Sequence, residues 1–470
     1  MNTATITFHG GAGTVTGANF LLDAGSKRIL IDCGIREREQ ICDPFNYDAF
    51  PYDPKIIDAL IVTHAHADHI GRIPKLVRDG FRNAIHSTSA TKELAAIMFE
   101  DALGVMQREA GIRGCGMLYE KEDVERALAL WQGHEYREPF GLPAGRQASE
   151  NVSVELLDAG HILGSAMIKL TRLRQGSGGQ ARSGPTILFT GDLGNSPEPL
   201  LNDTESPAGA HYLVMESVYG DRVHEEREER LEHLRAAVEE TRRRGGVLLI
   251  PSFSLERTQI LLSELNDMVE SGSMERIPVY LDAPLAIRAT EVYRRYSHML
   301  NTATRARFAK SDDPFSFPGL SLTAGSRESD AIHRAPDPKV IIAGAGMSHG
   351  GRIREHEKRY LSDKKATLLF VGYQAPGSLG RRIEDGEKRV EIDGEHVSIR
   401  ARIETLTGYS GHADRDLLLQ FAERAAGTLK KVFVTMGEPK SSLFLAQRLR
   451  DFLGVESVVP EAGQSFTIEW

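Results

Sequence analysis

The chain has 470 residues, of which 41% are hydrophobic and 26% are charged. This length is more than one hydrophobic core usually serves, so the sequence predicts two domains. Its 57 Lys and Arg residues against 66 Asp and Glu residues give a net charge of −9, which excludes a protein that coats nucleic acid nonspecifically through a general positive charge.

The sequence indicates neither export nor a membrane location. Three cysteines, Cys33, Cys42 and Cys115, are too few and too scattered for a disulfide framework. The N-terminus lacks the basic start and long apolar stretch of a signal peptide. No apolar run approaches the roughly 18 residues that span a membrane. We therefore expect a cytoplasmic protein that does not enter a membrane.

The first 215 residues combine short strand patterns with a few helical ones. Residues 56–63 form a near-continuous apolar run, typical of a strand buried on both faces. Helical patterns cover residues 90–108 and 121–131, and four more strand patterns follow before residue 216. Because strands and helices are both abundant, we expect an α/β fold.

From about residue 217 the chain repeats one unit four times: a strand, a loop rich in Gly, Ser or Pro, and a helix. Strands that alternate with helices predict a parallel sheet. The helix N-termini of such a domain lie along one sheet edge, where free backbone N–H groups favour phosphate. The repeats are GGVLLIPSFS with LERTQILLSEL, IPVYLDAP with LAIRATEVYRRY, KVIIAGAGMSHGG with RIREHEKRYL, and TLLFVGYQAPG with SLGRRIED.

After about residue 386 the short strand patterns return. This change predicts that the C-terminal part completes the first domain and that the repeated unit is inserted between its halves. The expected boundaries are therefore 1–215 for the first part of one domain, 216–385 for the inserted domain and 386–470 for the C-terminal part of the first.

The most informative motif is a run of four potential metal ligands, His64, His66, Asp68 and His69, directly after the apolar strand. Imidazole and carboxylate groups are the ligands of zinc and of metals close to it in affinity. His64 and His66 can project to the same side and hold one ion. Asp68 and His69, in the turn that opens the next helix, can face a second ion.

Two ions need further ligands, which we expect from other strand ends on the same sheet edge. His161 and Asp192 each follow an apolar strand. A lone His or Asp at such a place is more often a turn or cap residue, but the four-ligand run favours metal binding. Asp192, with two carboxylate oxygens, is suited to bridge the ions. Asp32, at the end of RILIDCG, can accept an N–H from a ligand histidine and fix its tautomer.

Such a site predicts metal-assisted hydrolysis. Two ions about 3.5–4 Å apart lower the pKa of a bridging water to near neutrality and stabilise the charge of a phosphorane. Asp68 is placed to hold the resulting hydroxide. This chemistry needs no nucleophilic side chain.

Several motifs resemble those of the β-CASP group of metallo-β-lactamase-fold nucleases. THAHADH, GHILGSAM and FTGDLG are similar to superfamily motifs, and MESVYG and YSGHAD to motifs specific to β-CASP proteins. The resemblance implies an αββα sandwich with an inserted parallel-sheet α/β domain, two Zn²⁺ ions and RNA as the partner. It also implies that the zinc ligands are His64, His66, Asp68, His69, His161 and Asp192.

The resemblance implies a catalytic set of Asp68, Glu216 and His412. Glu216 and His412 would lie beside the scissile phosphate. There the histidine can protonate the leaving oxygen, since its pKa is near neutral. The expected function is zinc-dependent hydrolysis of RNA phosphodiester bonds, in RNA processing or decay. Single-stranded RNA is the expected substrate, and a homodimer is possible.

One position departs from the β-CASP pattern. Met436, in VFVTMGEP, stands where the family has a histidine that binds the second zinc, and a thioether is a poor zinc ligand. Three other functions stay open, and the first of them follows from this change. The protein could be an RNA-binding member with impaired catalysis, a DNA-directed nuclease, or a small-molecule hydrolase of the same fold. The long inserted domain and His412 disfavour the last.

Overall fold

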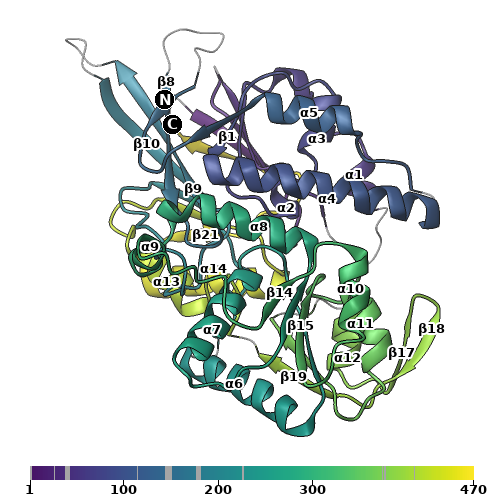
Figure 1. The fold of residues 1–470 in the computed structure, drawn as a ribbon. Coiled ribbons are helices and arrows are strands. Elements are labelled where there is room, and N and C mark those ends of the chain that lie inside the picture. The colour runs from purple at the N-terminus through teal and green to yellow at the C-terminus, as the bar shows by residue number, and fades with distance from the viewer. Residues whose placement is uncertain are drawn as a thin grey trace. The chain divides into compact units, whose positions relative to one another are not determined.

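The computed structural model describes residues 3–25, 27–36, 43–113, 115–142, 151–175, 181–224, 227–372, 374, 377–406 and 408–470. The chain divides into two compact units. The first unit is Met1–Val223 with His412–Trp470, and the second is His224–Gly411 (Figure 1). Each is described by itself.

The first unit contains two seven-stranded sheets. In one of them an N-terminal strand lies between the last strand of the chain and the second strand, antiparallel to both. Its strand order is β22 (Ser465–Glu469), β1 (Thr3–Gly10), β2 (Asn19–Asp23), β3 (Arg28–Ile31), β4 (Ala59–Ile61), β5 (Ile85–Thr88) and β6 (Trp131–His134).

The other sheet also combines strands from both ends of the unit. Its order is β21 (Glu456–Val458), β20 (Lys431–Val434), β11 (Tyr212–Met215), β10 (Ala181–Phe189), β9 (Ala166–Gln175), β8 (Asn151–Asp158) and β7 (Phe140–Gly141). β11 is parallel to both β10 and β20. The carboxyl ends of these three strands therefore lie at one edge, where Asp192, Glu216 and Met436 follow them.

The two sheets pack face to face around an apolar core that includes Phe8, Phe20 and Ile31 from one sheet and Ile168 and Phe189 from the other. Helices α13 (Arg415–Glu423) and α14 (Pro439–Leu453) cover the other face of the second sheet. Helix α4 (Ser89–Arg113) packs on β5 and β6 and on α5 (Lys121–Ala129). This is the predicted α/β/β/α arrangement, and the expected helices at 90–108 and 121–131 are confirmed. Short helices α1 (Pro44–Tyr47), η1 (Pro54–Ile56), α2 (Ala67–Ile70) and α3 (Ile73–Arg78) join the strands.

The second unit contains a six-stranded sheet in which every pair is parallel. The order is β14 (Leu320–Leu322), β13 (Val279–Asp282), β15 (Lys339–Ala343), β12 (Val247–Pro251), β16 (Thr367–Val371) and β19 (Arg402–Leu406). The four predicted strand–helix repeats are confirmed, with helices α7 (Arg257–Glu270), α8 (Pro284–Arg295), α11 (Ile353–Tyr360) and α12 (Leu379–Glu384). The other elements of this unit are α6 (Arg227–Arg244), η2 (Ser297–Met299), α9 (Thr302–Ala309), α10 (Ser326–Ile332), β17 (Arg389–Ile392) and β18 (Glu395–Ser398).

The second unit extends further than the sequence predicts. Its C-terminal limit is Gly411, whereas the strand pattern predicts a boundary near residue 385. The difference arises because β19 pairs in parallel with β16, and because the β17–β18 hairpin contributes Val390 and Val397 to the core of this unit. A short strand pattern alone does not reveal which sheet the strand joins.

Among the described residues, no helix is long and apolar enough to cross a membrane.

Candidate metal centre

The four-ligand run lies where β4 ends and α2 begins. His66 precedes the first helical residue, so His64 and His66 occupy extended backbone, whereas Asp68 and His69 belong to the first turn. His64 and His69 are completely buried. The change from extended to helical backbone therefore separates the run into two pairs, as the sequence predicts.

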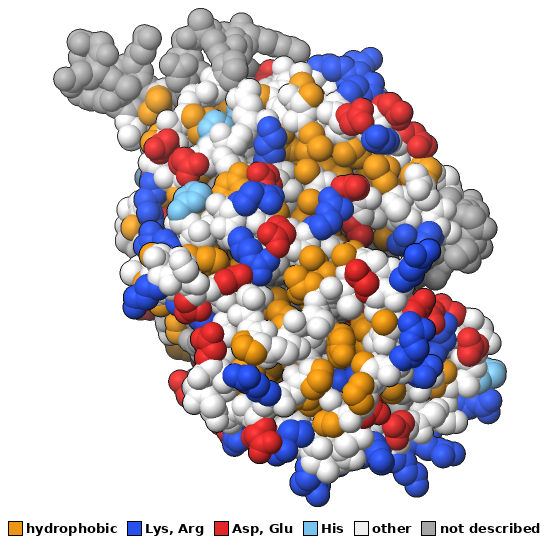
Figure 2. Space-filling model, in the orientation of Figure 1, with side chains coloured by type: hydrophobic (Ala, Val, Ile, Leu, Met, Phe, Trp, Pro, Cys, Tyr) orange, Lys and Arg blue, Asp and Glu red, His pale blue; other side chains and the backbone are white. Residues whose placement is uncertain are grey.

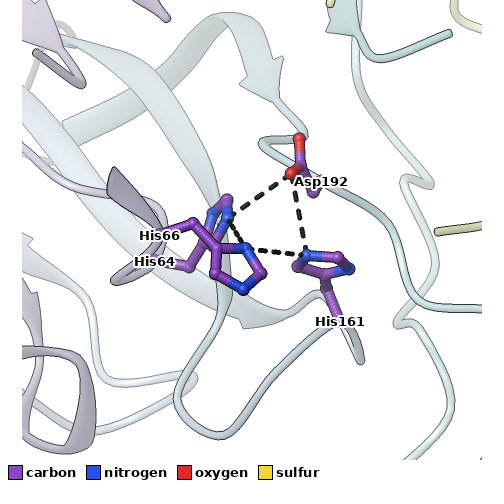
Figure 3. A group of neighbouring side chains, drawn as sticks. All are labelled: His64, His66, His161 and Asp192. Carbon is purple, nitrogen blue, oxygen red and sulfur yellow. Dashed lines mark hydrogen bonds and ion pairs between the residues drawn. The ribbon is translucent and has the colours of Figure 1, made fainter. Parts of the chain in front are cut away.

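A first group of four donor atoms comes from His64, His66, His161 and Asp192 (Figure 3). His66 Nδ1 lies 3.1 Å from His64 Nε2 and 3.3 Å from His161 Nε2. Asp192 Oδ2 lies 3.4 Å from His64 Nε2 and 3.7 Å from His161 Nε2. Three imidazoles and one carboxylate that face a common point are a suitable tetrahedral ligand set for zinc.

A second group is formed by Asp68, His69 and Asp192. His69 Nε2 lies 3.4 Å from Asp192 Oδ1 and 3.7 Å from Asp68 Oδ2. Within the described part of the chain, His69 Nε2 and Asp192 Oδ1 are buried and have no hydrogen-bond partner. An unsatisfied buried polar atom costs about 1–3 kcal/mol, and a cation between these two atoms would remove that cost. The residues present therefore fit a second ion, with Asp192 shared by both groups.

Asp32 fixes the orientation of the His69 ring through its Nδ1 atom, as the sequence predicts. Asp32 Oδ2 lies 2.8 Å from His69 Nδ1, which leaves Nε2 facing the donor group. Asp32 is itself held by two hydrogen bonds of 2.8 Å, one donated by the Thr63 backbone N–H and one by its hydroxyl. The sequence analysis did not single out Thr63, although its place directly before the run was a usable signal.

The loop that carries His161 joins β8 to β9 and is held by Ser165. The Ser165 hydroxyl oxygen accepts the backbone N–H groups of His161 and Ile162, at 3.0 and 3.2 Å. These bonds fix the backbone on which the imidazole depends. The sequence analysis did not identify Ser165, because a serine four residues after a histidine is not distinctive.

Glu216 and His412 lie beside the two groups and form a third with Asp192. Glu216 follows β11, and its Oε1 accepts the Leu193 backbone N–H at 2.7 Å. His412 makes an isolated β-bridge with Gly194, and its Nδ1 lies 3.3 Å from Glu216 Oε1. All eight residues singled out from the sequence are therefore brought together within the first unit.

Burial and mutual attraction shift the pKa values of these groups. Burial alone would lower the pKa of His69, but the carboxylates of Asp192 and Asp68 outweigh it and raise that pKa well above the usual value. His69 and His64 hold the pKa of Asp192 well below its ordinary value despite burial. Burial raises the pKa of Glu216. For His412 burial opposes the charge, yet Glu216 and Asp192 raise the pKa to about 9.

Met436 lies just after β20, at the same edge of the sheet as Glu216. Its carbonyl oxygen accepts the Ser217 backbone N–H, and its own N–H donates to Gly11 at 2.7 Å. The side chain is buried in the apolar core between the sheets. A Cβ atom added to Gly11 would lie 2.5 Å from the Met436 sulfur and 3.1 Å from the Phe20 ring, so the thioether occupies the space beside these two residues. The second donor group thus has three donors, while the thioether has apolar neighbours.

Family models match three stretches of the chain. The metallo-β-lactamase superfamily model matches residues 12–146, the β-CASP domain model matches residues 258–383, and a model described as "Zn-dependent metallo-hydrolase RNA specificity domain" matches residues 396–460. The last match crosses the limit between the two units at Gly411.

Relatives match along almost the whole chain. Ribonuclease TTHA0252 of Thermus thermophilus is 38% identical over 94% of this chain and 94% of its own length. The chain belongs to the β-CASP family of the metallo-β-lactamase superfamily. Two transcription termination factors FttA, from Methanocaldococcus jannaschii and Pyrococcus horikoshii, are each 31% identical over 97% of this β-CASP chain and cover 70% and 69% of their own lengths.

A solved structure has a similar fold. A protein of unknown function from Enterococcus faecalis superposes with a TM-score of 0.53 at 13% identity, covering 99% of this chain and all of that one. At this identity the likeness concerns the fold alone. The family places the chain among metal-dependent hydrolases, so its buried His and Asp cluster is where a divalent metal is expected.

Proposed function

We propose that this β-CASP protein hydrolyses phosphodiester bonds of RNA at a centre of two Zn²⁺ ions. The observation that carries the proposal is the meeting of two donor groups that share Asp192, with His412 and Glu216 beside them. A relative 38% identical over nearly the whole chain is named a ribonuclease. We propose a cytoplasmic location, and a homodimer stays a prediction from the sequence.

The side chains divide the chemistry between them. Bound zinc ions would lower the pKa of an attacking water and neutralise charge on the phosphate. His64, His66 and His161 would hold one ion, His69 and Asp68 the other, and Asp192 both. Asp68, partly exposed beside His69, would accept a hydrogen bond from the attacking water. His412, whose Nδ1 lies 3.3 Å from Glu216 Oε1, would donate a proton to the leaving oxygen.

We propose that RNA is bound by local features of the protein and not by a general positive charge. On the face drawn in Figure 2, basic and acidic side chains are interspersed. The net charge of −9 agrees with this pattern. We therefore propose that the substrate is a single-stranded segment of RNA, which the protein binds through a few phosphates and bases. DNA is the alternative substrate, since no residue has been identified that reads a 2′-hydroxyl.

The test of the proposed function is cleavage of end-labelled single-stranded RNA, alongside DNA of the same sequence and length, by protein of measured zinc content. We expect RNA cleavage that stops on chelation and returns with added zinc. Tight RNA binding without cleavage at any zinc concentration would instead support an RNA-binding member with impaired catalysis. Preferential cleavage of the DNA would support the DNA-directed alternative.

The unequal donor groups predict unequal zinc affinities. The first group offers four donors and the second three, so zinc titration should show one ion held tightly and a second held more weakly. Met436→His should leave zinc occupancy unchanged and lower the melting temperature, because the side chain lies in the apolar core, where an imidazole finds no hydrogen-bond partner. The positive φ of 46° at Met436 does not add to this loss of stability, since histidine is among the residues that tolerate that region.

Zinc stoichiometry of wild type and Met436→His, measured in one buffer with limiting zinc, decides this prediction. Met436→Leu is the matched control, because it keeps the apolar volume and adds no donor. Two equally tight ions in the wild type would contradict the prediction. So would a higher occupancy of the second site in Met436→His, which would show that residue 436 reaches the second ion.

A further inference from the structure

Helix α14 carries an aromatic and cationic stripe that the metal centre does not use. Phe444, Arg448 and Phe452 are four residues apart, so they follow one another along a single side of the helix. The Arg448 guanidinium carbon lies 5.0 Å from the ring centroid of Phe444 and 5.2 Å from that of Phe452. Phe452 is 61% exposed, the most exposed large hydrophobic residue in the described part of the chain.

These contacts order the stripe before any partner binds. A guanidinium held between two rings has lost much of its freedom, so little additional entropy is lost when a ligand contacts it. An arginine in this state offers its N–H donors to a phosphate, and an exposed aromatic ring offers a face for a nucleic-acid base. The stripe thus combines the two contacts that bind single strands irrespective of sequence.

The surroundings of the stripe do not suit a protein partner. The other strongly exposed apolar residue of the helix, Leu443 at 57%, is nine residues from Phe452. Nine residues are about 2.5 helical turns, so the two lie on opposite sides of α14. Gln447, Arg450 and Asp451 are exposed between them. A stable protein interface needs about 1,000 Å² or more with an apolar centre, which these separated side chains do not supply.

We propose that the Phe444–Arg448–Phe452 stripe is a binding surface for the single-stranded RNA outside the scissile bond. This inference rests on the proposed function. The stripe falls within the match to the RNA specificity model, residues 396–460. Helix α14 begins three residues after Met436. The Met436 carbonyl oxygen accepts the backbone N–H of Ser217, the residue after Glu216, so the start of the helix lies near Glu216. Phe452 is about 20 Å along the helix from that end, at 1.5 Å per residue.

This distance makes the effect of the stripe depend on substrate length. A short oligonucleotide that fills the metal centre does not reach Phe452, whereas a longer strand can. Phe452→Leu keeps an apolar side chain and removes the aromatic face, and Phe452→Trp restores a face. Leu322→Ala, at another exposed apolar residue, 43% exposed on β14, is the matched control.

The experiment measures kcat and KM on a short RNA and on one of about 20 nucleotides, longer than the roughly 4–16 that a stacking site spans. Phe452→Leu should raise KM for the long RNA about 5- to 150-fold, the effect of losing one stacked base. Its kcat, and both constants on the short RNA, should stay unchanged. Phe452→Trp and Leu322→Ala should behave like wild type.

Three results would overturn the proposal that the stripe binds RNA. They are an unchanged KM in Phe452→Leu, an equal rise of KM on both RNAs, and a change of oligomeric state in sedimentation, which would assign Phe452 to a contact with a second copy. If the wild type cleaves neither RNA, the proposed function fails instead. The anisotropy of the labelled long RNA then still tests the stripe, which predicts weaker binding to Phe452→Leu than to wild type.

Discussion

Asp68→Ala is expected to reduce RNA cleavage by at least the upper end of the roughly 10²–10⁴-fold range found for the loss of a proton-transferring group. The variant loses one of three donors of the second group and the carboxylate that is proposed to accept a hydrogen bond from the attacking water. The first donor group does not include Asp68, so the tightly held zinc should remain. RNA affinity should also remain, because the rest of the binding surface is untouched.

The measurement combines single-turnover cleavage, zinc content and RNA anisotropy on the same preparation. Asp68→Asn, which keeps the side-chain shape, should lose as much activity as Asp68→Ala. Asp203→Ala, which removes an exposed carboxylate of the same unit, should cleave like wild type. Wild-type rates in either Asp68 variant would falsify the assigned mechanism.

His412→Ala is expected to lower kcat about 10²–10⁴-fold with little change in KM, as when a general acid is removed. The imidazole is next to Glu216 and 3.9 Å from Asp192, but it belongs to neither of the two zinc donor groups. Zinc content should therefore stay at the wild-type level. The step that becomes slower should be the one in which the leaving oxygen is protonated.

A substrate with an activated leaving group separates this role from a structural one. An activated phosphodiester such as a nitrophenyl ester needs no proton on its leaving oxygen, so His412→Ala should cleave it nearly as fast as wild type does. His233→Ala, at an exposed histidine on α6, is the control for loss of an imidazole. An equal loss on both substrates would mean that His412 shapes the site rather than supplying the proton.

The sequence predicted which side chains lie together because potential ligands were concentrated at strand ends. His64, His66, Asp68 and His69 stand together directly after the apolar strand β4. The expectation that the other residues come from the same sheet edge was wrong, because Asp192 and Glu216 follow the parallel strands β10 and β11 of the other sheet, and the packing of the two sheets brings them to the run. The convergence of these groups with His161 and His412 is a feature of the structure. Their roles as ligands and catalysts remain proposals.

Other parts could not be predicted because they depend on contacts distant in sequence. The pattern of β19 is equally compatible with either unit, and only its pairing with β16 assigns it to the second. Thr63 supports His69 through two hydrogen bonds to Asp32, and Ser165 supports the His161 backbone through two more, none of which a periodicity reveals. Met436 shows the limit most clearly, since the motif indicates a missing ligand but not what the replacement contacts.

The pairing of β11 with β20 has a kinetic consequence. Tyr212 lies opposite Lys431 in that ladder, and the whole second unit is synthesised between them. Contacts between residues so far apart in sequence form slowly, because a long loop must close before they contribute any stability. During translation the strands that precede His64, His161 and Asp192 would leave the ribosome long before their two sheets are complete. The edge of β11 would stay unpaired meanwhile, open to aggregation, and His412 would join the centre last.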